Sequence, residues 1–259
     1  MSAPKRKKVR ADQLVHARGL AESRSKAAAL ILAGEVVAGE HRVEKPGQLV
    51  DEEIELRIKG ATPGSEQAAA LKYVSRGALK LEKALDAFGF SPAGKVCVDL
   101  GASTGGFTDL MLQRGALRVH AVDVGYGQLH EKLRQDPRVI SHERVNARAL
   151  TREQLGEAAR LAVADLSFIS LKLVLPALAG LLDGPGAEVA VLVKPQFEAG
   201  RAEVGKGGVV RNPEVHRRVV VEISAELERL RFQIVGAEES PLKGPAGNKE
   251  FLLGARLLP

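Results

Sequence analysis

A glycine-rich turn at residues 98–108 carries the clearest sign of chemistry in this sequence. It reads VDLGASTGGFT, leaves an apolar segment and enters a helical one. Small residues let the backbone approach a ligand closely, and such a turn presents N–H groups to that ligand. A dinucleotide site would favour glycine at positions 101, 103 and 106, but position 103 is Ser. The turn therefore predicts a nucleotide-type ligand without the full dinucleotide signature.

Asp123 strengthens this prediction. It ends the next apolar segment, 22 residues after Gly101. A carboxylate at that place accepts hydrogen bonds from ribose hydroxyls in nucleotide-binding folds. The alternative is a tight turn that binds nothing, and the later carboxylate makes that alternative the weaker one.

Four further charged residues stand where chemistry is expected. Asp165 and Lys194 each end an apolar segment, Lys80 lies in a helical segment before the glycine-rich turn, and Glu250 follows Gly-Asn-Lys near the C-terminus. Strand ends in a doubly wound sheet point into the ligand crevice. Any single charge of this kind could equally mark the point where a strand meets water. Two such charges in the same half of the fold favour a functional site.

Alternating apolar and amphipathic segments predict the elements that would position these residues. Helices are expected at residues 77–88, 108–113, 171–182 and 212–230. Strands are expected at residues 95–100, 118–124, 161–165, 187–193, 232–235 and 250–253. Fully apolar strands that alternate with helices indicate a largely parallel sheet covered on both faces, and hence an α/β domain.

The first 60 residues predict a separate, smaller α+β unit. Helices are expected at residues 10–17 and 24–33, with Ser23 as N-cap and Gly34 as the closing residue. Short strands are expected at residues 35–37, 41–43 and 53–58. Breakers at Pro63, Gly64 and Ser65 indicate a linker. The predicted organisation is a disordered basic arm at 1–8, the small domain at 9–60, a linker at 61–72 and the α/β domain at 73–259.

Positive charge is concentrated at the N-terminal side. The net charge is +6, and residues 1–45 hold ten Lys and Arg against five Asp and Glu. Such an excess attracts polyanions by releasing their counterions, although a solubilising tail has the same composition. Aromatic residues make up only 3% of the chain, which disfavours a base-stacking platform for single strands. The candidate contacts to the phosphates of such a polyanion are Lys5, Arg6, Lys7, Lys8, Arg10, Arg24 and Lys26.

The remaining composition limits the class of protein. Cys97 is the only cysteine, so no internal disulfide is possible, and a reducing, cytoplasmic location fits. The polar N-terminus is unlike a secretory signal, and no apolar run reaches 18 residues, so no membrane span is expected. No cysteine cluster suggests a structural zinc, and no metal is predicted.

Together these motifs resemble the TlyA-type rRNA 2'-O-methyltransferases, in which an alpha-L RNA-binding domain precedes an FtsJ-like domain. Residues 9–60 resemble the RNA-binding domain through RADQL at 10–14, SRSKA at 23–27 and LILAGEV at 30–36. Residues 73–257 resemble the FtsJ-like domain through SRG at 75–77, the glycine-rich turn, DLS at 165–167, KPQFE at 194–198 and GNKE at 247–250.

The resemblance implies a Rossmann-like catalytic domain, S-adenosylmethionine as cofactor, and ribosomal RNA or ribosomal subunits as partner. The family's catalytic Lys-Asp-Lys-Glu tetrad falls on Lys80, Asp165, Lys194 and Glu250. Asp99 is expected near the methionine part of the cofactor. The cofactor-binding residues that the resemblance implies are Ser75, Gly77, Asp99, Gly101, Ser103, Thr104, Gly105, Gly106, Phe107, Asp123, Val124, Asn146 and Asp165.

Lys194 has two possible roles in the implied transfer to a ribose 2'-OH. It is either a base or a charged group that stabilises the attacking oxygen. Burial and a nearby ammonium favour a neutral lysine, whereas carboxylates favour the charged form. Lys80 and Asp165 would orient Lys194, and Glu250 would steer the ribose or Lys80.

Three competing functions are weaker. A non-catalytic ribosome-assembly factor would have no need for all four charges of the tetrad. A membrane-active haemolysin, a name used for some relatives, would need a spanning or lytic segment that the sequence lacks. Cytosine C5 methylation needs a cysteine nucleophile, and Cys97 lies inside an apolar strand, where core packing is expected. Methylases of amino groups often carry an Asn/Asp-Pro-Pro-aromatic turn, whereas residues 165–168 read DLSF.

Overall fold

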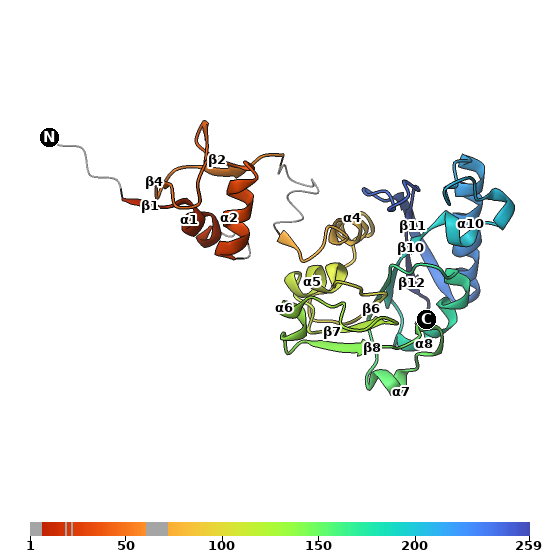
Figure 1. Cartoon of the computed structure of the whole chain (residues 1–259). Helices are drawn as coiled ribbons and strands as arrows, with labels where there is room; N and C mark the ends of the chain where they lie inside the picture. Colours follow the sequence, from red (N-terminus) through yellow and green to blue (C-terminus); the bar gives the residue numbers. More distant parts are fainter. Residues whose placement is uncertain (1–6, 19, 22, 61–71) are drawn as a thin grey trace. The chain divides into compact units, whose positions relative to one another are not determined.

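The computed structural model describes residues 7–18, 20–21, 23–60 and 72–259 (Figure 1). The chain divides into two compact units, Met1–Arg76 and Gly77–Pro259. The first unit combines short helices with short strands, and the second is a seven-stranded sheet with helices. The predicted α/β fold with a small α+β domain in front is therefore confirmed. The predicted linker lies mostly outside the described residues.

Helices α1 and α2 and two small sheets make up most of the described part of the N-terminal unit. Its elements are β1 (Lys8–Arg10), α1 (Ala11–Ala17), α2 (Arg24–Leu32), β2 (Val36–Ala38), β3 (His41–Arg42), β4 (Leu49–Asp51) and β5 (Leu56–Ile58). Strands β1 and β4 pair antiparallel, and the second sheet has the order β3-β2-β5. Helices α1 and α2 pack together around a core that includes Val15, Ile31 and Val36, each fully buried.

The predicted ends of α2 are confirmed. The Ser23 hydroxyl accepts a hydrogen bond from the backbone N–H of Lys26 at 3.1 Å, so Ser23 is the N-cap. Gly34 is left-handed, with φ of 78°. The N–H groups of Gly34 and Glu35 donate to the carbonyls of Ile31 and Leu30, which closes the helix as a Schellman motif.

The strands of this unit differ from the prediction. Strands β1 and β4 were not predicted, and the strand expected at 53–58 is only Leu56–Ile58. Lys8, assigned to a disordered arm, lies in β1, and the neighbouring Lys7 forms an ion pair with Glu52. Strands of three residues have too little periodicity to be recognised, because they form only by pairing with residues distant in sequence.

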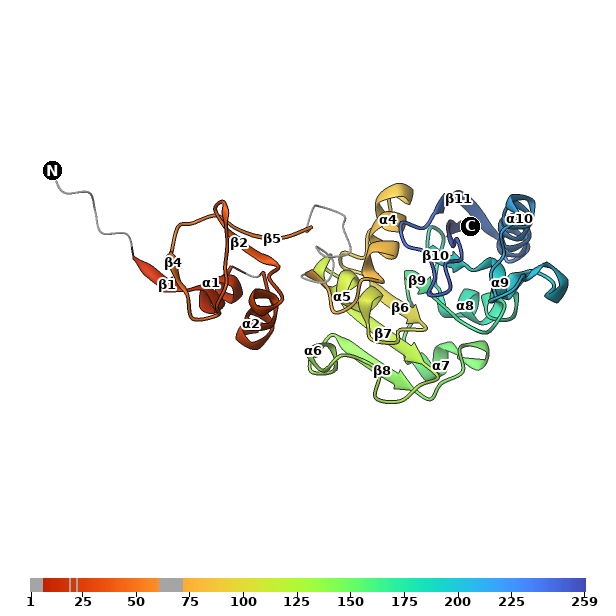
Figure 2. The same cartoon turned by 45° about the horizontal axis from the view of Figure 1, so that its top comes forward.

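The second unit is built on a mixed sheet with the order β11-β12-β10-β9-β6-β7-β8 (Figure 2). The strands are β6 (Val96–Leu100), β7 (Arg118–Asp123), β8 (Val139–Glu143), β9 (Leu161–Ala164), β10 (Glu188–Val193), β11 (Phe232–Glu239) and β12 (Phe251–Leu257). Strands β10, β9, β6, β7 and β8 are parallel neighbours, and β12 runs antiparallel to both β10 and β11. Edge strand β8 was missed because its sequence, VISHE, is half polar and its residues are partly exposed.

The helices cover both faces of this sheet (Figures 1 and 2). They are α4 (Ala78–Phe88), α5 (Gly106–Gln113), α6 (Glu131–Arg134), α7 (Arg152–Leu155), α8 (Leu175–Leu181), α9 (Pro195–Glu198) and α10 (Pro213–Arg229). Short 3-10 helices occupy Ala147–Ala149, Leu171–Leu173 and Arg201–Glu203. The helix expected at 171–182 is split, because Pro176 lacks an N–H and fits only in a first turn, so α8 begins at Leu175.

The order of the strands locates a ligand crevice. Strands β7 and β8 lie on one side of β6, whereas β9, β10, β12 and β11 lie on its other side, so the order of the strands reverses between β6 and β9. Ligands in doubly wound sheets bind at such a switch point, outside the carboxyl ends of the strands. The crevice is therefore expected where β6 and β9 end, at Leu100 and Ala164.

Candidate active site

The glycine-rich turn follows β6 and passes close to the end of β9. Gly101 has φ of 84°, a conformation that other residues rarely adopt. A Cβ at this position would lie 2.6 Å from the carbonyl oxygen of Asp165. Glycine is therefore required at position 101 both by the backbone conformation and by the close approach of the two segments.

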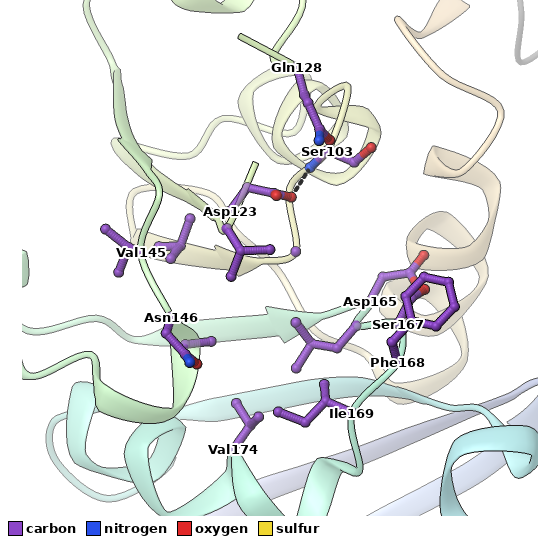
Figure 3. Close-up of a pocket in the computed structure, with 15 residues that line it drawn as sticks. Ser103, Asp123, Gln128, Val145, Asn146, Asp165, Ser167, Phe168, Ile169 and Val174 are labelled. Carbon is purple, nitrogen blue, oxygen red and sulfur yellow. Dashed lines mark hydrogen bonds between the residues drawn. The ribbon is translucent and has the colours of Figure 1, made fainter. Parts of the chain in front are cut away.

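A pocket of about 380 Å³ opens beside this turn (Figure 3). It brings together six of the predicted cofactor-binding residues: Gly101, Ser103, Asp123, Val124, Asn146 and Asp165. Most of its other lining side chains are apolar, and these were not predicted: Val122, Gln128, Val145, Ala147, Leu166, Ser167, Phe168, Ile169 and Val174. Val122 lies in β7 and Gln128 follows that strand, whereas the others follow β8 or β9, where only the DLS motif at 165–167 marks any of them in the sequence. An apolar pocket with a few polar groups suits an aromatic base joined to a sugar.

Asp123 is fixed at the end of β7 by two backbone donors. Its Oδ2 accepts from the N–H of Ser103 at 2.8 Å (Figure 3). Its Oδ1 accepts from the N–H of Gly125 at 2.7 Å. A carboxylate has about four acceptor positions, so lone pairs remain for two ribose hydroxyls. The carboxylate predicted from the sequence is therefore fixed by the backbone at the pocket wall.

Asp99 is fully buried in β6 and only half satisfied. Its Oδ2 accepts from the Thr108 hydroxyl at 2.7 Å, whereas its Oδ1 is buried and, within the described residues, has no hydrogen-bond partner. Burial raises the pKa of Asp99 to about 7. A buried acceptor without a donor fits a cationic group of a ligand, such as the ammonium of a methionine moiety.

The four charges of the predicted tetrad form one chain of contacts. Lys194 Nζ lies 2.6 Å from Asp165 Oδ1, and Lys80 Nζ lies 3.4 Å from Asp165 Oδ2 and 2.7 Å from Glu250 Oε2. Positive and negative groups therefore alternate from Lys194 to Glu250. The Glu250 side chain is only 1% exposed and that of Lys194 only 9%. Charges this deeply buried must be paired, and each of these is.

Ser167 was not predicted and also belongs to this cluster. Its hydroxyl accepts a hydrogen bond from Lys194 Nζ at 2.9 Å. Lys194 therefore donates to two acceptors on the segment that follows β9. A serine in a loop carries no periodic signal, so only its place in the DLS motif could have indicated this contact.

The other predicted cofactor residues lie outside the pocket lining. Gly77 is the N-cap residue of α4. Thr104, Gly105 and Gly106 continue the turn into α5, and the Phe107 side chain is buried in that helix. Ser75 falls within the N-terminal unit as the chain divides.

The predicted RNA-binding residues have individual environments. Lys5 and Arg6 lie outside the described residues. Lys8 and Lys26 are exposed, whereas Lys7 pairs with Glu52. Arg10 donates through Nε and Nη2 to both oxygens of Asp12, and Arg24 Nη2 lies 3.4 Å from the same carboxylate. These guanidinium groups lower the pKa of the buried Asp12 to about 2.

Cys97 is a core residue, as expected. Its side chain is fully buried in β6, and burial raises the pKa of the thiol to about 12. A nucleophilic cysteine needs an accessible thiolate. Methylation of cytosine C5 through Cys97 is therefore excluded.

Comparison with protein families identifies the class. Residues 73–257 match the model described as FtsJ-like methyltransferase, and residues 9–55 match the S4 domain. The chain therefore belongs to the FtsJ-like methyltransferase family and carries an S4 domain in front. It is an enzyme, and its methyl donor is S-adenosylmethionine, as the sequence predicts. The pocket beside Asp123 fits this donor, whereas Asp99 is fully buried and does not line that pocket.

Relatives of known name match nearly the whole chain. The 16S/23S rRNA (cytidine-2'-O)-methyltransferase TlyA of Mycobacterium tuberculosis (strain CDC 1551 / Oshkosh) is 48% identical over 250 residues, which are 96% of this chain and 90% of that protein. Hemolysin A of Brachyspira hyodysenteriae is 40% identical over 94% of this chain and 98% of its own length. A solved structure from Streptococcus thermophilus is 45% identical, with a TM-score of 0.72 over 97% of this chain and 89% of its own. The resemblance to the TlyA type is thus confirmed.

The name hemolysin raises the question of membrane insertion. Among the helices of the described residues, none combines the length and the apolar character that crossing a bilayer requires.

Proposed function

We propose that this protein transfers a methyl group from S-adenosylmethionine to the 2'-OH of a cytidine in ribosomal RNA, within a ribosomal subunit in the cytoplasm. The observation that carries the proposal is the chain of contacts from Lys194 through Asp165 and Lys80 to Glu250, which lies beside the cofactor pocket. The relative with 48% identity is named for this reaction on 16S and 23S rRNA. The domain boundaries 9–60 and 73–259 are part of the proposal.

Bound S-adenosylmethionine supplies a methyl group that its sulfonium makes electrophilic. The protein must hold a ribose hydroxyl in line with that methyl group, and such positioning can account for much of the rate gain. Asp123 would accept hydrogen bonds from the cofactor's ribose, and Asp99 would accept one from its ammonium. The apolar side chains of the pocket, such as Val145 and Ile169, would enclose the adenine.

Lys194 is the group that we place next to the attacking oxygen. An ammonium has three N–H donors, and Asp165 and Ser167 occupy two of them. Among the described residues no acceptor contacts the third, which can stabilise the negative charge that develops on the ribose oxygen. This arrangement favours the stabilising role of Lys194 over the role of base, so the proton of the hydroxyl passes to solvent water as the O–CH3 bond forms and the S–CH3 bond breaks. Asp165 orients Lys194, and Glu250 anchors Lys80 against the same carboxylate.

The S4 domain would supply affinity for RNA. Asp12 accepts from two of the five N–H donors of the Arg10 guanidinium, and because the described residues offer the other three no acceptor, these can bind phosphates. The side chains of Arg10 and Arg24 are about half exposed, at 45% and 54%. Together with Lys26 they form the proposed phosphate-binding group.

Methyl transfer from radiolabelled cofactor to ribosomal subunits and to naked rRNA tests the proposal. The wild type should place label at a site that resists alkaline cleavage, because a 2'-O-methyl group blocks that reaction. Lys194→Ala should lose the label by about a hundredfold or more while still binding the cofactor. The matched control is Lys95→Ala, since Lys95 pairs with Glu188 at 2.6 Å near the opposite end of the sheet. Near-normal turnover by Lys194→Ala would refute the assignment. Cofactor binding by the wild type without transfer to any ribosomal particle would favour a non-catalytic assembly factor.

A further inference from the structure

Glu198 is a half-buried carboxylate that the proposed reaction does not use. It is the last residue of α9, four positions after Lys194. Its Oε2 accepts from the Ser170 hydroxyl at 2.6 Å, and its Oε1 accepts from the backbone N–H of Leu171 at 2.8 Å. Both donors belong to the segment that follows β9. Glu198 therefore joins two segments that are distant in sequence.

These hydrogen bonds are the last in a series of contacts between segment 165–171, which follows β9, and segment 194–198, which follows β10. The series begins with the contacts of Lys194 to Asp165 and Ser167. It continues with the rings of Phe168 and Phe197, whose centroids are 5.4 Å apart. Since β9 and β10 are parallel neighbours, their carboxyl ends deliver the two segments side by side. Glu198 closes the series at the end farthest from the strands.

The segment that follows β9 needs such a restraint. Phe168 is left-handed, with φ of 64°, and its side chain is 92% exposed. A phenylalanine in this conformation is strained, and strain persists only where the surroundings hold the backbone on both sides. Asp165 is held by Lys194 on one side of Phe168. Ser170 and Leu171 are held by Glu198 on the other.

We propose that Glu198 is a positioning residue that holds segment 165–171 against α9, and thereby sets the distance between Asp165 and Lys194. The same segment lines the cofactor pocket through Leu166 and Ile169. A single carboxylate thus fixes both the catalytic lysine's partners and one wall of the cofactor site. The expected effect on turnover rests on the proposed function, whereas the expected effect on cofactor binding does not.

A purely stabilising role explains Glu198 less well. Burial raises the pKa of Glu198 above its ordinary value. A carboxyl group with a raised pKa in the folded state lowers the stability of the fold once the pH exceeds its unfolded pKa. Burial of this carboxyl group therefore costs stability, and the hydrogen bonds from Ser170 and Leu171 offset part of that cost. A role in positioning accounts for that cost.

The test compares Glu198→Ala, Glu198→Gln, Ser170→Ala and the Glu198→Ala/Ser170→Ala double variant in the full chain. For each, kcat per folded molecule is measured with ribosomal subunits, and the Kd for S-adenosylmethionine is measured by calorimetry. Glu198→Ala should lower kcat by about tenfold to a hundredfold, because misplacement by about 1 Å has that effect. It should also weaken cofactor binding severalfold. The matched control is Glu203→Ala, a nearby carboxylate that bonds to Gly200 and Arg218.

The glutamine variant distinguishes positioning from charge. Its carbonyl can accept from Leu171, and its amide can donate to the Ser170 hydroxyl, so both contacts survive and most of kcat should return. Ser170→Ala should add little to the effect of Glu198→Ala, because the two residues act together.

Two outcomes would overturn the inference, and a third would separate it from the proposed function. It is overturned if Glu198→Ala melts at a lower temperature but turns over within about twofold of the wild type per folded molecule. It is also overturned if glutamine restores neither turnover nor cofactor affinity. If the wild type methylates no ribose, the proposed function fails. Loss of cofactor affinity in Glu198→Ala and its return in Glu198→Gln would still support the positioning role.

Discussion

Replacing Asp99 by asparagine should stabilise the cofactor-free protein at pH 8 and weaken its binding of S-adenosylmethionine. Asp99 is completely buried, and burial raises its pKa from the ordinary 3.8 to about 7. The folded state therefore binds this proton more tightly than the unfolded state does. The stability of the wild type should fall as pH rises from about 4 to 7, and the full cost of ionised Asp99 is present above that range.

The magnitude follows from the difference between the two pKa values. A rise from 3.8 to about 7 corresponds to about 4 kcal/mol at pH 8. In the variant the new carbonyl can still accept from Thr108. The new amide nitrogen takes the place of Oδ1, which has no partner, and a buried unsatisfied donor costs about 1–3 kcal/mol. The expected net gain is therefore about 1–3 kcal/mol at pH 8, and it should disappear or reverse at pH 5.

Urea denaturation of the cofactor-free chain, followed by circular dichroism between pH 5 and 8, measures this difference. Asp109→Asn is the matched control, because Asp109 is also buried but lies 3.4 Å from the ammonium of Lys132. That control should lose stability or stay unchanged at pH 8. Binding of S-adenosylmethionine should weaken in Asp99→Asn, since the unpartnered anionic oxygen is replaced. The reasoning would be refuted if Asp99→Asn were less stable than the wild type at pH 8. It would also be refuted if the substitution changed the free energy of unfolding equally at pH 5 and pH 8.

Three further outcomes are expected. Gly101→Ala should abolish cofactor binding and lower stability by about 1–3 kcal/mol, because its Cβ would lie 2.6 Å from the Asp165 carbonyl; calorimetry and thermal melting check this. Arg24→Ala combined with Lys26→Ala should weaken RNA binding. It should also reduce the slope of the logarithm of the binding constant against the logarithm of salt concentration by about one to two, because about one to two phosphate contacts are lost. An unchanged slope in a filter-binding assay would move the RNA site elsewhere. Glu250→Ala should cost about 3–5 kcal/mol of stability in a denaturation assay, because it leaves the Lys80 ammonium without its closest partner.

The parts of the fold that could be predicted are those with long or fully apolar patterns. Strand β10 is buried along its whole length, and α10 carries Asn212 as N-cap and Pro213 in its first turn. Such signals are local, so the sequence contains them. Strands β1, β4 and β8 were missed because they are short or half exposed, and pairing with distant residues decides whether they form.

The residues of the candidate site were likewise predicted where a local pattern marks them and missed where none does. The glycine-rich turn, Asp123 and the tetrad were predicted, because strand ends and motifs mark them in the sequence. Ser167 and Glu198 were missed, although both lie in motifs quoted from the sequence, since Ser167 is in a loop and Glu198 ends a helix of only four residues, and neither position has a periodicity that distinguishes it from a solvated one. Asp12 is a further example: it falls in the helix predicted at residues 10–17, but only the structure shows that it is buried and paired with Arg10 and Arg24.

The sequence alone therefore determined the class of domain and the type of cofactor, and it predicted the residues that carry chemistry, because these depend on local patterns and on a family motif. Only the tertiary structure decided how those residues act together. Lys80 and Glu250 lie 170 positions apart, yet their side chains meet at 2.7 Å through the packing of α4 near the residue that precedes β12. Distances, burial and the raised pKa of Asp99 arise from such packing, because the free energy of a charge depends on what surrounds it in space.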